Sequence, residues 1–249
     1  MEKQTSVNNT FYDALHDLWH EGSLHPVALL RAENELRNPW IRTIIEKRHA
    51  GRCKILDIGC GGGLLTNAMA KEGHEVFGVD LSSGSLAHAQ KKDSTKSVTY
   101  LSAPAESLPF EEGSFDVVCA MDLLEHVQDP ALVIAEASRV LKNKGLFFFH
   151  TFNRTWLSWL VVIKGVEWCV RNTPPDMHLY RFFVTPKEMK KMCQAHHMHV
   201  EKILGVRPDI KSKAFWRMVF LREVTPEFRF VFTPSLKTGY SGYATKLRE

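Results

Sequence analysis

Short apolar runs alternate with longer amphipathic stretches between residues 54 and 151. This alternation is typical of β-α-β units that build a parallel sheet. Strands are predicted at 54–58, 75–80, 97–101, 115–121 and 146–151. Helices are predicted at 64–73, from Ser82 or Ser83 to about Gln90, and from Pro130 to about Leu141. We therefore expect an α/β fold with a parallel sheet at its centre.

The pattern is looser after residue 151. A helix is predicted from Thr185–Pro186 to about Ala195, and strands are predicted at 199–206 and near Phe228–Phe232. The C-terminal residues 235–249 are polar and rich in small side chains, so we expect this segment to be mobile.

A tryptophan-rich stretch after residue 153 has helical spacing. The apolar positions recur every three or four residues and predict one apolar helix face, formed by Trp156, Trp159, Leu160, Ile163, Val166 and Val170. Lys164 and Arg171 would flank this face. Such helices lie in membrane interfaces, so the stretch predicts peripheral membrane contact through residues 154–171. The alternative is a helix that covers the core of the domain.

Composition bounds the class of protein. The chain has 249 residues, of which 44% are hydrophobic, and this length is compatible with one large α/β domain. A net charge of +4 argues against an acidic tail and against a strongly basic nucleic-acid binder. The five cysteines form no CxxC pair, which favours reduced thiols. Neither a secretory signal nor an apolar run of membrane-spanning length is evident, so a cytoplasmic location is expected.

The strongest chemical signal is the loop Asp57-Ile-Gly59-Cys60-Gly61-Gly62-Gly63 between a predicted strand and helix. Glycines allow a ligand to approach the backbone, and Asp80 stands where an acid can bind ribose hydroxyls. A dinucleotide loop needs glycine where this chain has Leu64. Because Asp57 would repel phosphate and attract an ammonium group, the loop favours S-adenosylmethionine over NAD.

This loop resembles motif I of the class I methyltransferases, and Asp80 resembles their motif II acid. The segments 102–110 and 115–130 resemble the loops that hold the adenine in that family. By this resemblance Ala105 and Glu106 would flank the adenine, and the Met121 thioether would lie against it. Pro104 replaces the Asp that many members carry, so hydrophobic packing would matter more here. The cofactor contacts that the resemblance implies are Asp57, Gly59, Cys60, Gly61, Asp80, Leu81, Ala105, Glu106 and Met121.

Two flanking segments resemble the O-methyltransferases of ubiquinone biosynthesis. One is residues 11–42, where the Asn-x-Leu-Arg match would pair Arg37 with the carboxylate of the cofactor's methionine. The other is residues 151–189, where the matches are Asn153-Arg154, Ser158-Trp159-Leu160, the His178 turn and the run from Phe183 to Glu188. The resemblance covers about residues 11–205, and residues 207–249 depart from it.

A third match follows the fourth predicted strand. The family's Asp/Glu-x-x-Glu-His motif is present as Asp122, Glu125 and His126, which the resemblance implies as a site for a divalent metal such as Mg²⁺. A metal there would lower the pKa of a catechol. Alternatively, His126 acts as a general base without metal, or the motif has a structural role.

The resemblance implies a class I methyltransferase fold with a seven-stranded, mostly parallel sheet, helices on both faces and an antiparallel last strand. We expect one domain over residues 1–249, comprising an N-terminal helical cap at 1–50, a cofactor-binding core at 51–152, an acceptor- or membrane-facing insertion at 153–185, and the rest of the sheet with a tail at 186–249.

The expected reaction is methylation of a ring hydroxyl of a polyprenyl catechol. The expected setting is the cytoplasmic membrane surface, or the mitochondrial matrix side in a eukaryote, in contact with other quinone-synthesising proteins. Three alternatives stay open. They are another small acceptor (including carbon methylation of a quinone ring), a non-catalytic cofactor-binding scaffold, and an NAD-dependent oxidoreductase.

Overall fold

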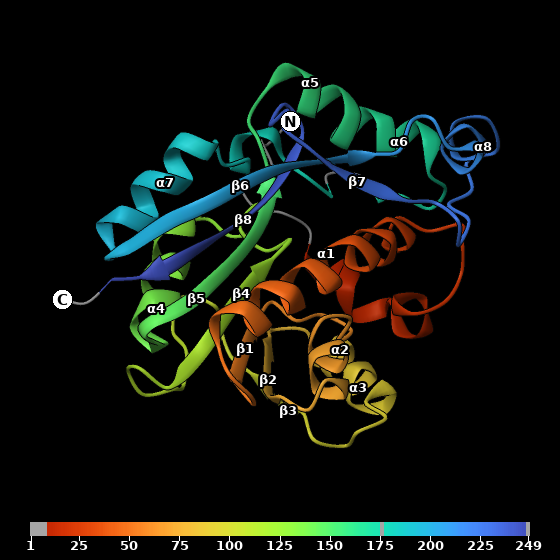
Figure 1. The fold of residues 1–249 in the computed structure, drawn as a ribbon. Coiled ribbons are helices and arrows are strands. Elements are labelled where there is room, and N and C mark those ends of the chain that lie inside the picture. Colours follow the sequence, from red (N-terminus) through yellow and green to blue (C-terminus); the bar gives the residue numbers. More distant parts are fainter. Residues whose placement is uncertain (1–8, 175–176, 248–249) are drawn as a thin grey trace.

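A single sheet runs through the computed structural model, which describes residues 9–174 and 177–247 (Figure 1). In this part of the chain the sheet has eight strands in the order β3-β2-β1-β4-β5-β8-β6-β7. The strands are β1 (Lys54–Ile58), β2 (Glu75–Asp80), β3 (Thr99–Ser102), β4 (Phe115–Met121), β5 (Leu141–Phe152), β6 (Met198–Pro208), β7 (Phe230–Thr233) and β8 (Gly239–Lys246). β7 and β8 run opposite to the other six strands.

The parallel half of the sheet confirms the sequence pattern. β1, β2 and β4 have the predicted bounds, because each is a run of apolar residues that the sheet buries. β3 begins two residues later than predicted and β5 begins five residues earlier. The central strands β1 and β4 pair in parallel, so their carboxyl ends meet at one edge of the sheet.

The prediction of seven strands and a mobile C-terminal segment is wrong. Residues 239–246 form β8, which lies between β5 and β6 and places Tyr240 and Ala244 in the core. Small residues admit this strand, since a Cβ atom on Gly242 would lie 2.4 Å from Cζ of Phe149. In residues 239–246, small side chains therefore allow β8 to pack closely against the Phe149 ring, and they do not indicate mobility.

Helices cover both faces of the sheet (Figure 1). α1 (Val27–Arg48) and α2 (Thr66–Lys71) pack on one face, where Ile41, Ile45 and Met69 contact the strands. α3 (Ser83–Lys92) lies beside α2. On the other face α4 (Pro130–Val140) and α7 (Pro186–Ala195) bury Ile134 and Met189 against the sheet.

Two predicted helix starts are confirmed by their caps, whereas the helix predicted from residue 64 begins at Thr66 without a side-chain cap. The Ser82 side chain accepts a hydrogen bond from the Ser85 amide at the start of α3. α7 begins at Pro186. Its N-cap is a capping box, in which the Thr185 hydroxyl accepts from the Glu188 amide and the Glu188 carboxylate accepts from the Thr185 amide. These helix starts depend on residues within one turn of the chain, so the sequence alone predicts where they lie.

The tryptophan-rich stretch forms a continuous helix of α5 (Trp156–Ser158), a π-helical turn (Trp159–Gly165) and α6 (Val166–Cys169), named the tryptophan helix below. The predicted single apolar face is wrong. Of the residues on that face, Val170 is buried, whereas Trp156 is 73% exposed and Trp159 is 43% exposed. A π-helical turn has more residues per turn than an α-helix, so it rotates the later side chains away from the predicted face.

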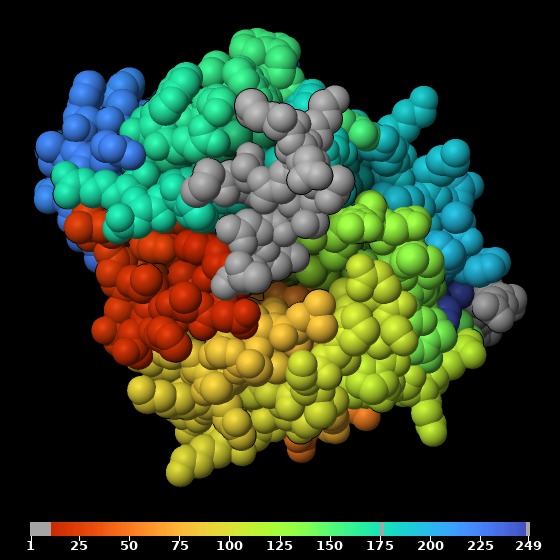
Figure 2. Space-filling view, turned by 180° about the vertical axis from the view of Figure 1, so that it is seen from behind, coloured from red at the N-terminus to blue at the C-terminus, as the bar shows by residue number. Residues whose placement is uncertain are grey.

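A second helix, α8 (Lys213–Leu221), was not predicted and packs against α6. Figures 1 and 2 show it along the same edge of the molecule as the tryptophan helix. Short 3₁₀ helices occur at Asn9–Ala14, His16–Trp19 and Tyr180–Phe182. Among the described residues, no helix is long and apolar enough to cross a membrane.

Candidate functional site

A cavity of about 920 Å³ opens at the carboxyl ends of β1, β2 and β4, beneath the N-terminal 3₁₀ helices and the tryptophan helix. Small-molecule sites span about 300–1,000 Å³, so this volume can hold a donor and an acceptor together. The lining includes most of the predicted site residues, namely Asp57, Gly59, Cys60, Gly61, Asp80, Leu81, Ala105, Glu106, Met121, Asp122, Glu125 and His126. Arg37 does not line it.

The glycine loop is held against the end of β2. The amides of Gly59 and Cys60 donate to the Val79 carbonyl oxygen at 2.7 and 3.0 Å. The Asp80 carboxylate accepts from the Gly61 amide and from the Ser82 amide, both at 2.8 Å. These bonds fix the Asp80 carboxylate at the cavity wall beside the loop, where its predicted contact with a ribose is geometrically available.

The N-terminal segment closes over this loop. Trp19 packs on the loop so tightly that a Cβ atom on Gly62 would lie 2.2 Å from its Cγ. The Trp19 indole also donates to Ser85 Oγ at 3.1 Å and stacks on Tyr12. Two glycines of the loop, Gly61 and Gly62, are therefore needed for protein packing, in addition to any contact with a ligand.

Seven carboxyl groups line the cavity, those of Asp13, Glu33, Asp57, Asp80, Glu106, Asp122 and Glu125. Burial raises the pKa of Asp57 and Asp80, and raises that of Glu33 and Glu125 to about 8. Ionising such groups together in a dry site is unfavourable unless a cation accompanies them. Asp57 and Asp80 lie at the glycine loop, so the donor end of the cavity suits a positively charged ligand.

Arg37 lies behind the cavity wall. Its guanidinium donates to both oxygens of Asp122, at 2.8 and 2.5 Å, and is fully buried. Burial disfavours ionisation of Asp122, but the charge of Arg37 outweighs this effect and holds the pKa of the carboxyl below its usual value. The bidentate pair fixes Asp122, which has a left-handed φ of 57°. The pairing of Arg37 with a cofactor carboxylate stays a prediction.

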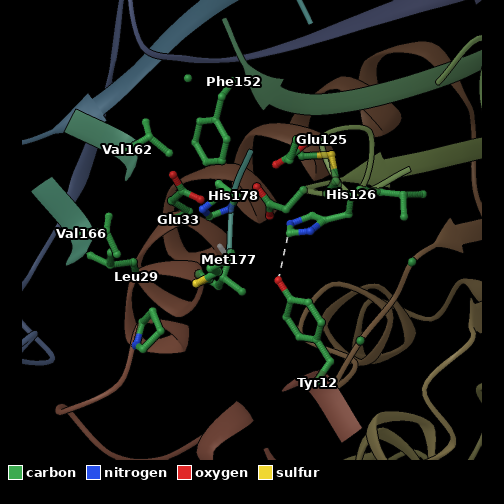
Figure 3. Close-up of a pocket in the computed structure, with 18 of the residues that line it drawn as sticks. Tyr12, Leu29, Glu33, Glu125, His126, Phe152, Val162, Val166, Met177 and His178 are labelled. Carbon is green, nitrogen blue, oxygen red and sulfur yellow. Dashed lines mark hydrogen bonds between the residues drawn. The ribbon is translucent and has the colours of Figure 1, made fainter. Parts of the chain in front are cut away.

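A cluster of polar side chains forms the centre of the cavity (Figure 3). Tyr12 Oη lies 3.4 Å from His126 Nε2, and the ring centres of His126 and His178 are 5.2 Å apart. Burial lowers the pKa of His126 to about 4 and that of His178 to about 3, so both imidazoles are neutral near pH 7. A neutral imidazole can accept a proton or bind a metal.

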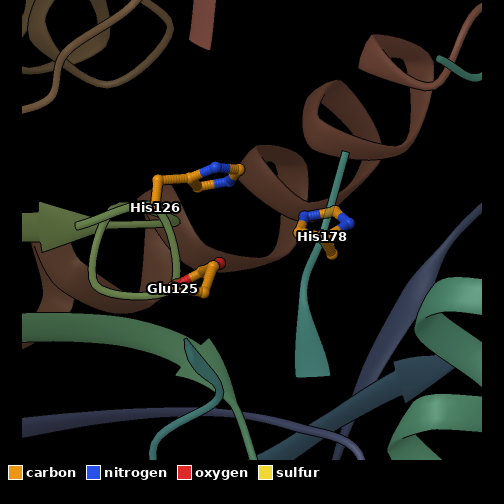
Figure 4. Close-up of side chains that lie close together, drawn as sticks. All are labelled: Glu125, His126 and His178. Carbon is orange, nitrogen blue, oxygen red and sulfur yellow. The ribbon is translucent and has the colours of Figure 1, made fainter. Parts of the chain in front are cut away.

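Glu125 completes this cluster (Figure 4). Its Oε2 accepts from Thr151 Oγ1 at 2.7 Å, whereas its Oε1 is buried with no hydrogen-bond partner among the described residues. A buried carboxylate oxygen without a partner is costly, which makes this atom a candidate ligand for a cation.

The predicted metal ligands do not form one group. Glu125 and His126 lie with His178, and potential ligand atoms of the three are all within 4.8 Å of one another. Asp122 instead lies with Glu33 and His150. Two imidazoles and one carboxylate suit Mn²⁺, Fe²⁺ or Zn²⁺ better than Mg²⁺, which prefers oxygen.

Sequence reasoning did not assign four residues of the site: Tyr12, Trp19, Glu33 and His178. A signal existed for two of them, because Tyr12 and Trp19 are among the aromatic residues of the N-terminal segment that carries the family resemblance. His178 is far from His126 in the chain, and only the fold brings the two together.

Comparisons with known proteins identify the family. A family model described as a methyltransferase domain matches residues 56–149. The ubiquinone biosynthesis O-methyltransferase of Thiobacillus denitrificans is 36% identical over 212 residues, which cover 82% of this chain and 88% of the relative. The Leptothrix cholodnii protein of the same name is 34% identical over 212 residues, covering 83% and 88%.

Solved structures agree on the fold. Magnesium protoporphyrin IX methyltransferase of Synechocystis, solved with bound S-adenosylhomocysteine, superposes with a TM-score of 0.66 at 16% identity and covers 96% of this chain and 95% of that one. A methyltransferase from Aquifex aeolicus gives 0.54 at 13% identity, covering 83% and 89%. The chain is therefore an S-adenosylmethionine-dependent methyltransferase that belongs to the ubiquinone biosynthesis O-methyltransferase family.

Proposed function

We propose that this enzyme transfers a methyl group to a ring hydroxyl of a polyprenyl catechol in ubiquinone biosynthesis. The observation that carries the proposal is a single cavity that joins the glycine loop and Asp80 to the cluster of Tyr12, His126 and His178. The names of the relatives support the same reaction and the same phenolic lipid.

The two ends of the cavity suit the two substrates. S-adenosylmethionine supplies a methyl group on a positively charged sulfur, and the buried carboxyls at the donor end complement its charge. The acceptor hydroxyl lies at the histidine cluster, and its oxygen bonds to the methyl carbon as the carbon–sulfur bond breaks. If no metal is bound, the neutral imidazole of His126 accepts the hydroxyl proton. Much of the rate enhancement comes from holding oxygen, carbon and sulfur in line.

A divalent cation would be held by Glu125, His126 and His178. Such a cation would lower the pKa of the acceptor hydroxyl. The unpartnered Glu125 Oε1 supports this part of the proposal. Chelation with EDTA is expected to slow methylation at least about tenfold, and Mn²⁺ is expected to restore it better than Mg²⁺. An unchanged rate after chelation would mean that His126 acts as the base without metal.

Peripheral membrane contact through residues 154–171 is the second element of the proposal. Trp156, Trp159 and Trp168 are exposed on the tryptophan helix, and α8 exposes Trp216 and Phe220 on the same edge of the molecule (Figures 1 and 2). Exposed aromatic side chains on neighbouring helices suit the interface of a bilayer that contains the lipid acceptor.

Flotation with liposomes tests this contact. Changing Trp156 and Trp159 to Asp is expected to abolish flotation without unfolding the enzyme, because both side chains are exposed. Leu132→Asp is the matched control, since Leu132 is an exposed apolar residue on α4. Flotation of the double variant at the wild-type level would contradict membrane docking.

Deleting the gene tests the reaction itself. Mass spectrometry of the extracted lipids is expected to show an accumulated polyprenyl catechol and a depleted quinone pool. The purified enzyme should then methylate that catechol and release S-adenosylhomocysteine. An unchanged quinone pool would contradict the proposed function. Methylation of a quinol ring carbon, and not of a hydroxyl, would show that the proposed acceptor atom is wrong.

A further inference from the structure

The cavity continues past the histidine cluster into an apolar chamber, defined here by Leu29, Val166, Phe215, Met218, Phe228 and Phe230. These side chains come from α1, the tryptophan helix, α8 and the segment that leads into β7. They belong to one hydrophobic cluster, in which Met218 and Phe228 are buried. These six side chains therefore both pack α8 onto the domain and line the cavity.

The chamber and the histidine cluster face one another across the cavity. In Figure 3, Leu29, Val162 and Val166 lie on one side, Tyr12 and His126 lie on the other, and Glu33 and His178 lie between them. When the hydroxyl of an acceptor ring lies at His126, the opposite edge of the ring therefore faces the chamber.

The chemistry of the chamber selects a hydrocarbon. All six defining side chains are apolar, so they offer no side-chain hydrogen bond to a polar group, and placing such a group there would be unfavourable. A flexible methionine adapts to a methyl-branched chain. Val161 and Trp168 line the cavity and are also exposed, which opens it toward the aromatic edge of the molecule.

We infer that this chamber binds the isoprenoid tail of the acceptor and that Met218 limits how much of the tail it holds. This inference rests on the proposed function and deepens it. It assigns a role to α8, which lies in the part of the chain that departs from the family resemblance.

The test uses the full-length enzyme and two acceptors, a catechol with one isoprene unit and a catechol with three. For wild type, KM is expected to be at least about tenfold lower with three units, because additional apolar surface is buried. Met218→Trp fills the chamber and is expected to remove most of this preference by raising KM for the three-unit acceptor alone. Leu221→Trp is the matched control, since Leu221 is 53% exposed at the end of α8 and does not line the cavity.

Equal KM values for the two acceptors in wild type, or an equal rise for both in Met218→Trp, would overturn the inference. Binding of S-adenosylhomocysteine by calorimetry shows whether the variant is folded. If Met218→Trp is not folded, Met218→Ala replaces it in the test. The enlarged chamber of Met218→Ala should lower KM for a catechol with four isoprene units relative to the catechol with three. If wild type methylates neither acceptor, the proposed function fails, while calorimetric binding of the same two catechols still tests the chamber.

Discussion

The donor end and the acceptor end of the cavity are built in different ways. The donor end uses short loops after β1 and β2, with backbone amides and the Asp80 carboxylate in fixed hydrogen bonds. The acceptor end uses side chains from residues 12–30, 160–170, 177–182 and 206–230, most of them apolar, which meet only in the folded molecule. A small charged donor needs fixed polar partners, whereas a long apolar acceptor needs volume.

The difference predicts how each end responds to change. Loss of a buried polar contact leaves its partner unsatisfied and has a large, specific effect. Loss of apolar contact has a graded effect that scales with the area left exposed.

The largest effect is expected at the boundary, where His126 faces the acceptor. His126→Ala should lower kcat by about 100-fold or more while the Kd for S-adenosylhomocysteine stays within about twofold, because proton transfer is lost and donor binding is not. Steady-state kinetics and calorimetry measure the two quantities. His199→Ala, on the exposed side of β6, is the control. A wild-type kcat in His126→Ala would remove this residue from the reaction.

The contact between the two ends is tested at Gly62. Gly62→Ala would drive a methyl group into Trp19 and should lower the free energy of unfolding by about 2 kcal/mol, measured in urea. In a Trp19→Gly background the same change should cost less than about 0.5 kcal/mol, because Cβ, Cγ and Cδ2 of Trp19, the atoms that a Gly62 methyl would meet, are all removed. Equal costs in both backgrounds would show that the N-terminal segment does not depend on the glycine loop.

At the donor end, Asp80→Ala should weaken binding of S-adenosylmethionine at least about tenfold, since hydrogen bonds to a charged group are lost. Calorimetry gives the Kd directly. Glu75→Ala changes an exposed carboxylate at the opposite end of the same strand and should leave the Kd unchanged. An unaltered Kd in Asp80→Ala would refute its assignment to the cofactor site.

The smallest effect concerns pH and the ligand-free enzyme. Glu33 and Glu125 have folded pKa values near 8, above the usual 4.5, so the folded state binds more protons and loses stability as pH rises toward 8. The buried His126, His150 and His178 have lowered pKa values, and they raise stability as pH climbs to about 6.5.

The two effects oppose one another below about pH 6.5, and only the carboxyls act above it. The free energy of unfolding should therefore fall by about 1 kcal/mol or more between about pH 6.5 and 8. Glu125→Gln should flatten this part of the curve. Urea unfolding at a series of pH values measures it, and a rise in stability over that range would contradict the burial of these carboxyls in protonated form.

Sequence reasoning succeeded where structure is local. β1, β2 and β4 have the predicted bounds because continuous apolar runs mark strands that are buried on both faces. The caps at Ser82 and Thr185 were equally readable, since each depends on residues within one helical turn. The donor-end residues follow from the same locality, because the glycine loop and Asp80 belong to one β-α-β unit.

Periodicity failed where the partner of a segment decides its conformation. The tryptophan helix has the expected helical composition, but a π-helical turn changes which residues face inward. Residues 239–246 have the composition of a mobile segment, yet they form β8 in the sheet, where Gly242 leaves room for the Phe149 ring. Hydrophobicity along a chain does not encode the surface that a segment will meet.

The sequence by itself determined the sheet's parallel half, the glycine loop, Asp80 and the class of donor, because these depend on neighbours along the chain. The tertiary structure alone decided that Arg37 binds Asp122, that His178 joins Glu125 and His126, and that α8 closes an apolar chamber. Each of these contacts joins residues far apart in sequence, and no local propensity specifies which distant surfaces will meet.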